Sequence, residues 1–354
     1  MTPLEGLLIR RIRATGPITL AEYMAECLLH PRFGYYSTRD PFGAKGDFIT
    51  APEISQMFGE LLGLSLAQTW LDQGSPARFT LAELGPGRGT CMADILRATR
   101  NVPGFWAAAE VVLIEASETL RGVQAKTLLA HAPGWAHSVA DLPDQPLFLL
   151  ANEFFDALPI DQFQHGPDGW RHCMVGLTGG TLNFGLSDLL PCPDRRFAAD
   201  PPGTTIELCN SAAPIAAHIG ALIRQHGGAA IIIDYGGWRS KGNTLQALRN
   251  HLTESALANP GMADLTAHVD FEPLALAAGP DICSPLTDQG AWLARLGIHL
   301  RAARLASGLS GQSLENHLSA TRRLTDPAEM GTLFKVMAIY PPHSLPPPGF
   351  DPNA

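Results

Sequence analysis

The feature that most constrains the fold is a strand-like run followed by closely spaced glycines. Residues 79–84 read Phe-Thr-Leu-Ala-Glu-Leu, an apolar run typical of a buried strand. Glycines then follow at every second position, at Gly85, Gly87 and Gly89, and a helix-compatible segment comes next. A strand, a glycine turn and a helix in this order open a nucleotide-binding α/β fold. Glycine suits this turn because it lets the backbone bend sharply and lets a ligand lie against the main chain.

The spacing of the glycines indicates the ligand. The dinucleotide fingerprint G-x-G-x-x-G places its third glycine three positions after the second, whereas Gly89 comes two positions after Gly87. An acidic residue, Glu83, stands two positions before Gly85. This E-x-G-x-G-x-G arrangement resembles the first motif of class I methyltransferases, which bind S-adenosylmethionine. That ligand lacks a pyrophosphate and needs carboxylates for its ammonium group and its ribose hydroxyls. The alternative is a glycine-rich turn with a structural role only.

Composition limits the class of protein and its partners. The chain has 354 residues, of which 45% are hydrophobic and 17% are charged, as in a globular protein. A net charge of −9 disfavours general nucleic-acid binding and suits a basic protein substrate. The six cysteines include no C-x-x-C pair, and H-E-x-x-H is absent, so we expect no metal site. No apolar run reaches about 18 residues, so we expect no membrane span.

Two further acids follow predicted strands. Glu115 ends the second strand, residues 109–115, at the edge where an open parallel sheet binds its ligands. A carboxylate there can accept hydrogen bonds from both ribose hydroxyls, although Glu115 could instead cap the next helix. Asp141 follows a third strand near residues 136–140, and we expect it to reach the adenine amino group. Its position among turn-forming residues is the competing explanation.

A second chemical stretch follows the fourth strand, residues 146–151. It reads Asn-Glu-Phe-Phe-Asp-Ala-Leu-Pro at residues 152–159. Its carboxylates, Glu153 and Asp156, are three residues apart and could hold a guanidinium group through paired hydrogen bonds. The aromatic residues between them would exclude water and attract the sulfonium. The alternative is a strand-to-helix turn in which the acids cap the helix.

The rest of the chain completes the predicted sheet. Residues 161–210 are too many for a simple crossover, so we interpret them as an insertion on the substrate side. The fifth strand, residues 229–236, carries Asp234 at its end, either in the acceptor pocket or in a turn. His268 lies in a stretch that could reach the same edge and act as a proton acceptor, or it could be a structural histidine. Thr287 is expected to open a helix that runs to Gly297, and residues 334–340 form the last strand.

Three regions are expected on this basis. Residues 1–78 form a helical N-terminal extension and lid, with capping boxes at residues 19–22 and 50–53. Residues 79–340 form the methyltransferase domain, which carries the insertion. Residues 341–354 are a proline-rich tail.

Several segments together resemble one family far more specifically than the glycine turn alone. They match the MidA-like class I methyltransferases, whose mitochondrial member is complex I assembly factor 7. The segments are Phe-Gly-Tyr-Tyr-Ser at 33–37, Gly-Asp-Phe-Ile-Thr-Ala-Pro-Glu-Ile-Ser-Gln-Met-Phe-Gly-Glu at 46–60, Glu-Leu-Gly-Pro-Gly-Arg-Gly-Thr at 83–90, Asn-Glu-Phe-Phe-Asp-Ala-Leu-Pro at 152–159, Asp-Leu-Thr-Ala-His-Val-Asp-Phe at 264–271 and Met-Gly-Thr-Leu-Phe-Lys-Val at 330–336.

The resemblance implies a Rossmann-like α/β fold with a seven-stranded, mostly parallel sheet and a reversed last strand. It implies S-adenosyl-L-methionine as cofactor and a protein arginine as acceptor, which for the mitochondrial member lies on a subunit of the respiratory NADH dehydrogenase. Gly85, Gly87 and Glu115 would hold the donor, and Asn152 and Glu153 would face the reaction centre. The absence of a long presequence favours a bacterial, cytoplasmic relative, with the mitochondrial matrix as the expectation for a eukaryotic source.

The predicted function is therefore methyl transfer to a protein arginine. The expected cofactor-binding residues are Glu83, Gly85, Gly87, Gly89, Glu115, Asp141 and Asn152, and the expected catalytic residues are Asn152, Glu153, Asp156 and His268. One alternative is an assembly chaperone that keeps the fold without the activity. Another is a nicotinamide-dependent oxidoreductase, which the compressed glycine spacing opposes.

Overall fold

The computed structural model describes residues 1–38 and 50–351 of the chain. The chain divides into two compact units that alternate along the sequence. Unit 1 comprises residues 1–48, 156–213 and 238–270, and unit 2 comprises residues 49–155, 214–237 and 271–354.

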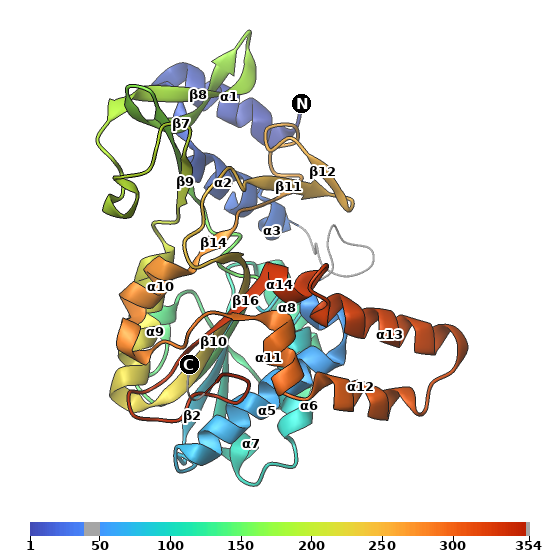
Figure 1. Cartoon of the computed structure of the whole chain (residues 1–354). Coiled ribbons are helices and arrows are strands. Elements are labelled where there is room, and N and C mark those ends of the chain that lie inside the picture. Colours follow the sequence, from blue (N-terminus) through green and yellow to red (C-terminus); the bar gives the residue numbers. More distant parts are fainter. Residues whose placement is uncertain (39–49, 352–354) are drawn as a thin grey trace. The chain divides into compact units, whose positions relative to one another are not determined.

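Unit 2 is built around a mostly parallel β-sheet (Figure 1). In spatial order, its strands within the described residues are β15 (Thr287–Asp288), β16 (Phe334–Ile339), β10 (Gly228–Gly237), β5 (Leu147–Asn152), β2 (Phe79–Leu84), β3 (Ala109–Ile114) and β4 (Gly134–Ala136). The five strands from β10 to β4 are parallel, whereas β16 is antiparallel to both β10 and β15. The mostly parallel order and the reversed last strand agree with the predicted sheet, although β15 was not predicted as a strand.

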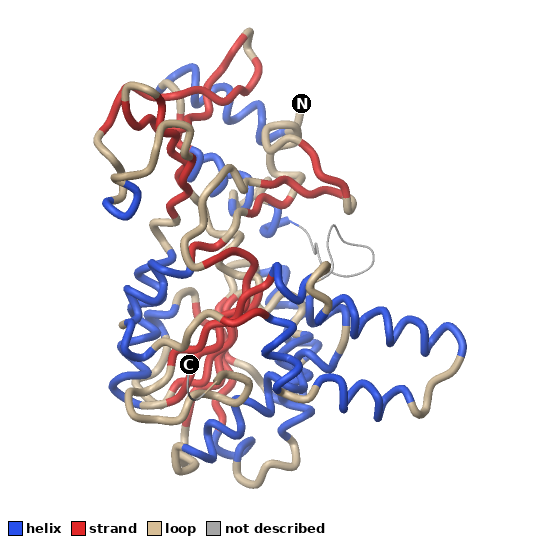
Figure 2. Tube along the Cα trace, viewed as in Figure 1, coloured by secondary structure: helices blue, strands red, loops and turns tan. Residues whose placement is uncertain are grey.

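Helices cover both faces of this sheet (Figure 2). Because both faces are covered, β2 and β5 are buried along their whole length, which explains why their sequences are mostly apolar. The helices of unit 2 are α4 (Ala51–Ile54), α5 (Gln56–Asp72), α6 (Thr90–Thr99), α7 (Phe105–Ala108), α8 (Glu118–Thr127), α9 (Ala212–His226), α10 (Phe271–Ala278), α11 (Gln289–Arg295), α12 (Ile298–Ala306), α13 (Gly311–Thr325) and α14 (Met330–Leu333).

Two helix starts differ from the sequence prediction. Residues 50–53 were expected to open one long helix, but Thr50 makes no side-chain capping bond and α4 ends after four residues. Ser55 is extended and caps α5 by accepting a hydrogen bond from the Met57 amide. The predicted box fails because the Glu53 carboxylate instead accepts a hydrogen bond from Thr90 Oγ1, at 2.6 Å.

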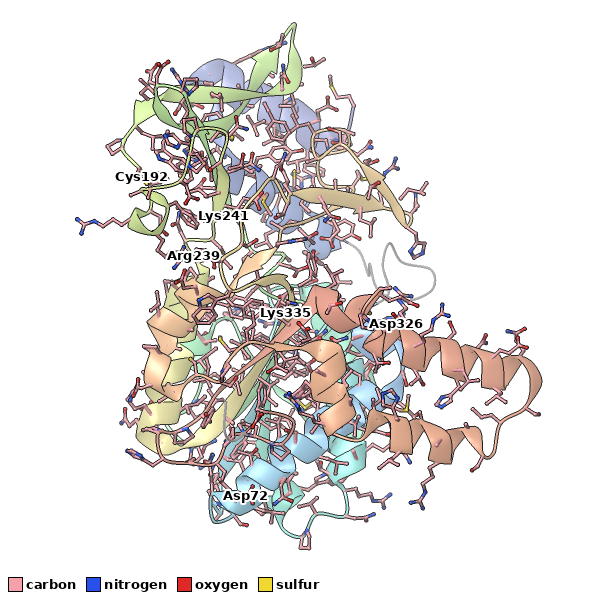
Figure 3. All side chains as sticks on the ribbon, in the orientation of Figure 1. Asp72, Cys192, Arg239, Lys241, Asp326 and Lys335 are labelled. Carbon is pink, nitrogen blue, oxygen red and sulfur yellow. The ribbon has the colours of Figure 1, made fainter. Side chains whose placement is uncertain are left out.

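At the other end of the sheet, Thr287 was expected to begin a helix, whereas Thr287 and Asp288 form β15 and α11 begins at Gln289. Asp288 precedes α11 without capping it, since its carboxylate binds Lys335 Nζ on β16 at 2.6 Å. Lys335 is labelled in Figure 3. This ion pair joins directly opposite residues of β15 and β16.

Unit 1 packs the N-terminal helices against the predicted insertion. Ile18 pairs with Val175, and both side chains are buried in one cluster with α1 and α2. Its elements are α1 (Pro3–Thr15), β1 (Ile18–Thr19), α2 (Leu20–Leu29), α3 (Tyr35–Thr38), β6 (Asp161–Gly166), β7 (Gly169–Thr178), β8 (Thr181–Leu190), β9 (Thr205–Leu208), β11 (Gln246–Arg249), β12 (Leu252–Glu254), β13 (Asp264–Thr266) and β14 (Val269–Asp270). The predicted capping box at residues 19–22 is present.

The expected three regions distribute over these units as follows. Of the expected N-terminal extension, α1 to α3 lie in unit 1 and α5 lies in unit 2. The expected insertion contains β6 to β9, and β7 and β8 form a hairpin around Gly179 and Gly180. In the tail, Phe350 is buried against Trp292 of α11, so this segment packs onto unit 2.

Among the described residues, no helix combines the length and the apolar character needed to span a membrane. In the same residues, no group of three or more His, Cys, Asp or Glu side chains is arranged to hold a metal ion.

Candidate active site

The glycine turn lies at the carboxyl end of β2 and adopts a backbone that other residues rarely accept. Gly85, Gly87 and Gly89 have φ angles of 57°, 52° and 80°, all in the left-handed region. A β-carbon on Gly85 would lie 3.0 Å from Cδ2 of Phe154, so the space beside the backbone is as restrictive as its conformation. The sequence therefore needs glycine at this position.

Glu83 is a buried acid with an incomplete set of partners. Burial raises its pKa to about 8, although a hydrogen bond from the Met92 amide opposes the shift. Its Oε2 atom has no hydrogen-bond partner among the described residues. A buried, unpartnered carboxylate oxygen is costly, and a cationic donor would stabilise its ionised form. The ammonium group of S-adenosylmethionine is a donor of this kind.

Glu115 follows β3 and is held beside the glycine turn. Its Oε1 accepts a hydrogen bond from the Ser117 amide at 2.8 Å, and its Oε2 accepts one from Gln124 Nε2 at 3.0 Å. Burial raises its pKa, and these hydrogen bonds oppose the shift. Ser117 is itself the N-cap of α8. The carboxylate thus contacts the start of α8, as the capping alternative required. Gln124 also donates a hydrogen bond to the Gly87 carbonyl and so bridges Glu115 and the glycine turn.

The second predicted stretch lies directly beside the glycine turn. Leu84 of β2 pairs with Ala151 of β5, so the residues that follow them leave neighbouring strands at the same edge. The Phe154 ring lies beside Gly85, with Cδ2 3.0 Å from where a β-carbon on Gly85 would be. The two motifs that the sequence identified separately therefore meet at the carboxyl ends of β2 and β5, where parallel sheets bind ligands.

Glu153 adopts a strained backbone that fixed hydrogen bonds maintain. Its φ angle is 51°, which is uncommon outside glycine and often marks a functional site. Its amide donates to the Ile233 carbonyl at 2.9 Å. Its Oε1 accepts from the Ala51 amide, at the start of α4, at 3.1 Å, and from Asn152 Nδ2 at 3.0 Å. The carboxylate is therefore held in place before any substrate arrives.

Asn152 and Asp234 complete this turn. Asn152 is buried, and its Oδ1 has no partner among the described residues. Asp234 is also buried and accepts hydrogen bonds from the amides of Phe155 and Tyr235, each at 3.0 Å. Of the two roles that the sequence left open for Asp234, these contacts support the turn.

The remaining predicted site residues are Asp141, Asp156 and His268. Asp141 is exposed, and its Oδ2 accepts hydrogen bonds from Ser138 Oγ and from the amides of His137 and Ser138. The hydrogen bond from the Ser138 side chain is the largest factor that lowers its pKa. Asp156 and His268 belong to unit 1, where the Asp156 carbonyl accepts from the Ala267 amide at 3.0 Å. Burial lowers the pKa of His268.

The sequence pattern did not reveal two supporting contacts. Gln124 is a buried polar residue on α8, and the only sequence signal for it is its place beside Leu120 on the helix's inner face. The Thr90–Glu53 hydrogen bond joins the first residue of α6 to α4. Both contacts link residues that are distant in the chain, so local periodicity cannot predict them.

Comparison with known proteins is consistent with this geometry. Residues 61–284 match the sequence profile of a family described as "Putative S-adenosyl-L-methionine-dependent methyltransferase". The chain belongs to this family. It thus belongs to the S-adenosylmethionine-dependent methyltransferases that the sequence predicted, and the predicted fold and cofactor are confirmed.

Named relatives extend over nearly the whole chain. The bovine (Bos taurus) protein named protein arginine methyltransferase NDUFAF7, mitochondrial, is 36% identical over 375 residues, which cover 98% of this chain and 85% of the relative. The Drosophila melanogaster homologue is 36% identical, with 95% and 85% covered. A crystal structure of a Burkholderia thailandensis protein bound to S-adenosyl-homocysteine has a TM-score of 0.81, with 27% identity, and covers 98% of this chain and 92% of that one.

Proposed function

We propose that the protein transfers the methyl group of S-adenosylmethionine to an arginine side chain of a protein substrate. The observation that carries this proposal is the closeness of Phe154 to Gly85, because Asn152 and Glu153, which we assign to the acceptor, directly precede Phe154 in the chain. The names of the relatives, which are protein arginine methyltransferases, support the same activity.

In this proposal the donor is held by residues at the ends of β2 and β3. Glu83 Oε2 would accept a hydrogen bond from the ammonium group, and Glu115 would accept from the ribose hydroxyls. Gly85, Gly87 and Gly89 would allow the ligand to approach the backbone. Asp141 remains a predicted contact to the adenine. Asn152 remains a predicted contact to the donor near its sulfonium. When bound, S-adenosylmethionine supplies an electrophilic methyl group on its sulfonium.

The acceptor arginine would meet the turn that follows β5. Glu153, already held by Ala51 and Asn152, would bind the guanidinium, and Asn152 Oδ1 would accept a further hydrogen bond. These groups orient the attacking nitrogen and stabilise the positive charge of the guanidinium as the methyl is transferred. The rings of Phe154 and Phe155 would exclude water. They pack edge to face, with their ring centroids 5.2 Å apart. Asp156 and His268 stay predicted contributors.

A methyl-transfer assay tests the proposal. The purified protein is incubated with S-adenosylmethionine carrying an isotopic methyl label and with a cell lysate, and labelled peptides are identified by mass spectrometry. We expect labelled methylarginine with the wild type. We expect loss of label with Glu153→Gln, while binding of S-adenosyl-homocysteine is retained. Glu118→Gln is the matched control because the Glu118 side chain is 84% exposed on α8. Label on residues other than arginine would contradict the proposed acceptor.

The acceptor that we propose is a subunit of the respiratory NADH dehydrogenase, as the family resemblance implies. Mass spectrometry of the labelled lysate identifies it directly. A Glu153→Gln variant that loses methylation but still supports assembly of that complex would favour the chaperone role instead. The cellular compartment, cytoplasm or mitochondrial matrix, stays a prediction that follows from the acceptor.

A further inference from the structure

A buried glutamine joins the two parts of the proposed donor site. Gln124 of α8 is 0% exposed. Its Nε2 donates to the Gly87 carbonyl at 2.8 Å and to Glu115 Oε2 at 3.0 Å, and its Oε1 accepts from Trp135 Nε1 at 2.9 Å. We propose that Gln124 is a positioning residue that fixes the Glu115 carboxylate relative to the glycine turn and thereby sets the selectivity for the donor's ribose. This inference rests on the donor site described under the proposed function.

Only one orientation of the Gln124 amide satisfies its neighbours. The indole nitrogen of Trp135 can only donate a hydrogen bond, and the Gly87 carbonyl can only accept one. A flipped amide would place the Gln124 oxygen against two acceptors, the Gly87 carbonyl and the Glu115 carboxylate. It would also place the Gln124 NH₂ group against a donor, the indole N–H of Trp135. The amide NH₂ group is therefore directed at both Gly87 and Glu115, and Trp135 on β4 enforces that orientation.

The same contacts fix the plane of the Glu115 carboxylate. One oxygen is bound by Gln124 and the other by the Ser117 amide. The backbone of Glu115 is held as well, because its carbonyl accepts a hydrogen bond from Arg121 Nε at 2.9 Å. Each carboxylate oxygen can accept more than one hydrogen bond, so both remain able to accept from a ribose hydroxyl. A carboxylate fixed in this way loses little conformational entropy when the ribose binds.

Substitution of Gln124 should therefore weaken recognition of the ribose through Glu115. Gln124→Met keeps the length of the side chain but removes the hydrogen bonds to both parts of the site. Gln124→Glu keeps the shape and places a carboxylate against the Gly87 carbonyl and Glu115. Gln145→Met is the matched control. Gln145 binds Thr80 and Glu110 near the amino ends of β2 and β3, whereas the proposed donor site lies at their carboxyl ends.

The experiment measures dissociation constants by calorimetry on the full chain, for S-adenosyl-homocysteine and for its 2′-deoxyribose analogue. We expect Gln124→Met and Gln124→Glu to weaken binding of S-adenosyl-homocysteine roughly tenfold or more, as for a lost buried hydrogen bond to a charged group. We also expect both variants to discriminate less between the two ligands. Gln145→Met should match the wild type in both respects. In a Glu115→Gln background, Gln124→Met should cause little further loss, because Gln124 acts through Glu115.

The ratio of the two dissociation constants separates positioning from a general loss of stability, because it does not depend on the fraction of protein that is folded. Wild-type selectivity in both Gln124 variants would overturn the inference and leave the donor site intact. Additive effects of Glu115→Gln and Gln124→Met would also overturn it. Failure of the wild type to bind S-adenosyl-homocysteine would instead overturn the proposed function.

Discussion

The buried carboxyl group of Glu83 makes the stability of the ligand-free protein depend on pH in a defined direction. Burial raises its pKa from 4.5 to about 8, so the folded protein retains a proton that the unfolded chain has released. Between these two pKa values the folded state binds more protons, and the free energy of unfolding therefore falls as pH rises. The stabilisation is fully present below the unfolded pKa and is lost by the time pH exceeds the folded one.

The size of this effect follows from the two pKa values. A shift from 4.5 to about 8 gives a loss of roughly 2–3 kcal/mol in unfolding free energy between pH 5 and pH 7. Glu83→Gln replaces the acid with a neutral side chain of the same shape, so this contribution should vanish. The unfolding free energy of the variant minus that of the wild type should therefore be larger at pH 7 than at pH 5.

Guanidinium unfolding of the ligand-free wild type and of Glu83→Gln, each at pH 5 and pH 7, measures the effect. Other titrating groups, His268 among them, occur in both proteins and cancel in the double difference. We expect the pH dependence of the variant to be smaller by roughly 2–3 kcal/mol. Identical pH dependence in the two proteins would refute the burial of an unpartnered acid beneath the glycine turn.

Three further predictions concern single positions. Gly85→Ala should lower the free energy of unfolding by roughly 1–3 kcal/mol, because it places a β-carbon at a positive φ and 3.0 Å from Phe154; an unchanged urea midpoint would contradict this. Asp141→Ala should weaken binding of S-adenosyl-homocysteine severalfold if the residue reaches the adenine, and an unchanged dissociation constant would assign Asp141 to capping alone. His268→Gln should lower kcat without changing donor affinity, since burial lowers the histidine's pKa and keeps it able to accept a proton at neutral pH; an unchanged kcat would exclude that role.

Local sequence signals were sufficient for the six longer strands of the sheet of unit 2, but not for the edge strand β15. Residues 79–84 and 147–152 are mostly apolar because their strands are covered on both faces, and the glycines that follow β2 mark a backbone that needs positive φ angles. The acids at or just after the carboxyl ends of β2, β3 and β5 could be assigned to one edge of the sheet because parallel strands end there. These inferences depend only on neighbouring residues and on the rules of parallel sheets.

Long-range contacts explain what the sequence did not predict. The capping box at residues 50–53 fails because Glu53 binds Thr90, which lies 37 residues away in the chain. Asp288 does not cap α11 because it binds Lys335. Residues 238–270 join the N-terminal helices and the insertion in unit 1 although they are distant from both in the chain. The hydrogen-bond partners of Gln124 also lie outside its own helix, so the sequence of α8 alone did not predict its role.

The proposed methyl transfer requires a donor nucleoside seated on the glycine turn with its ribose at the end of β3. A crystal structure of the protein with S-adenosyl-homocysteine tests this directly. We predict both ribose hydroxyls within about 3 Å of the Glu115 carboxylate oxygens, and the ammonium group as the partner of Glu83 Oε2. A ligand bound elsewhere, or one whose ribose does not contact Glu115, would contradict the account.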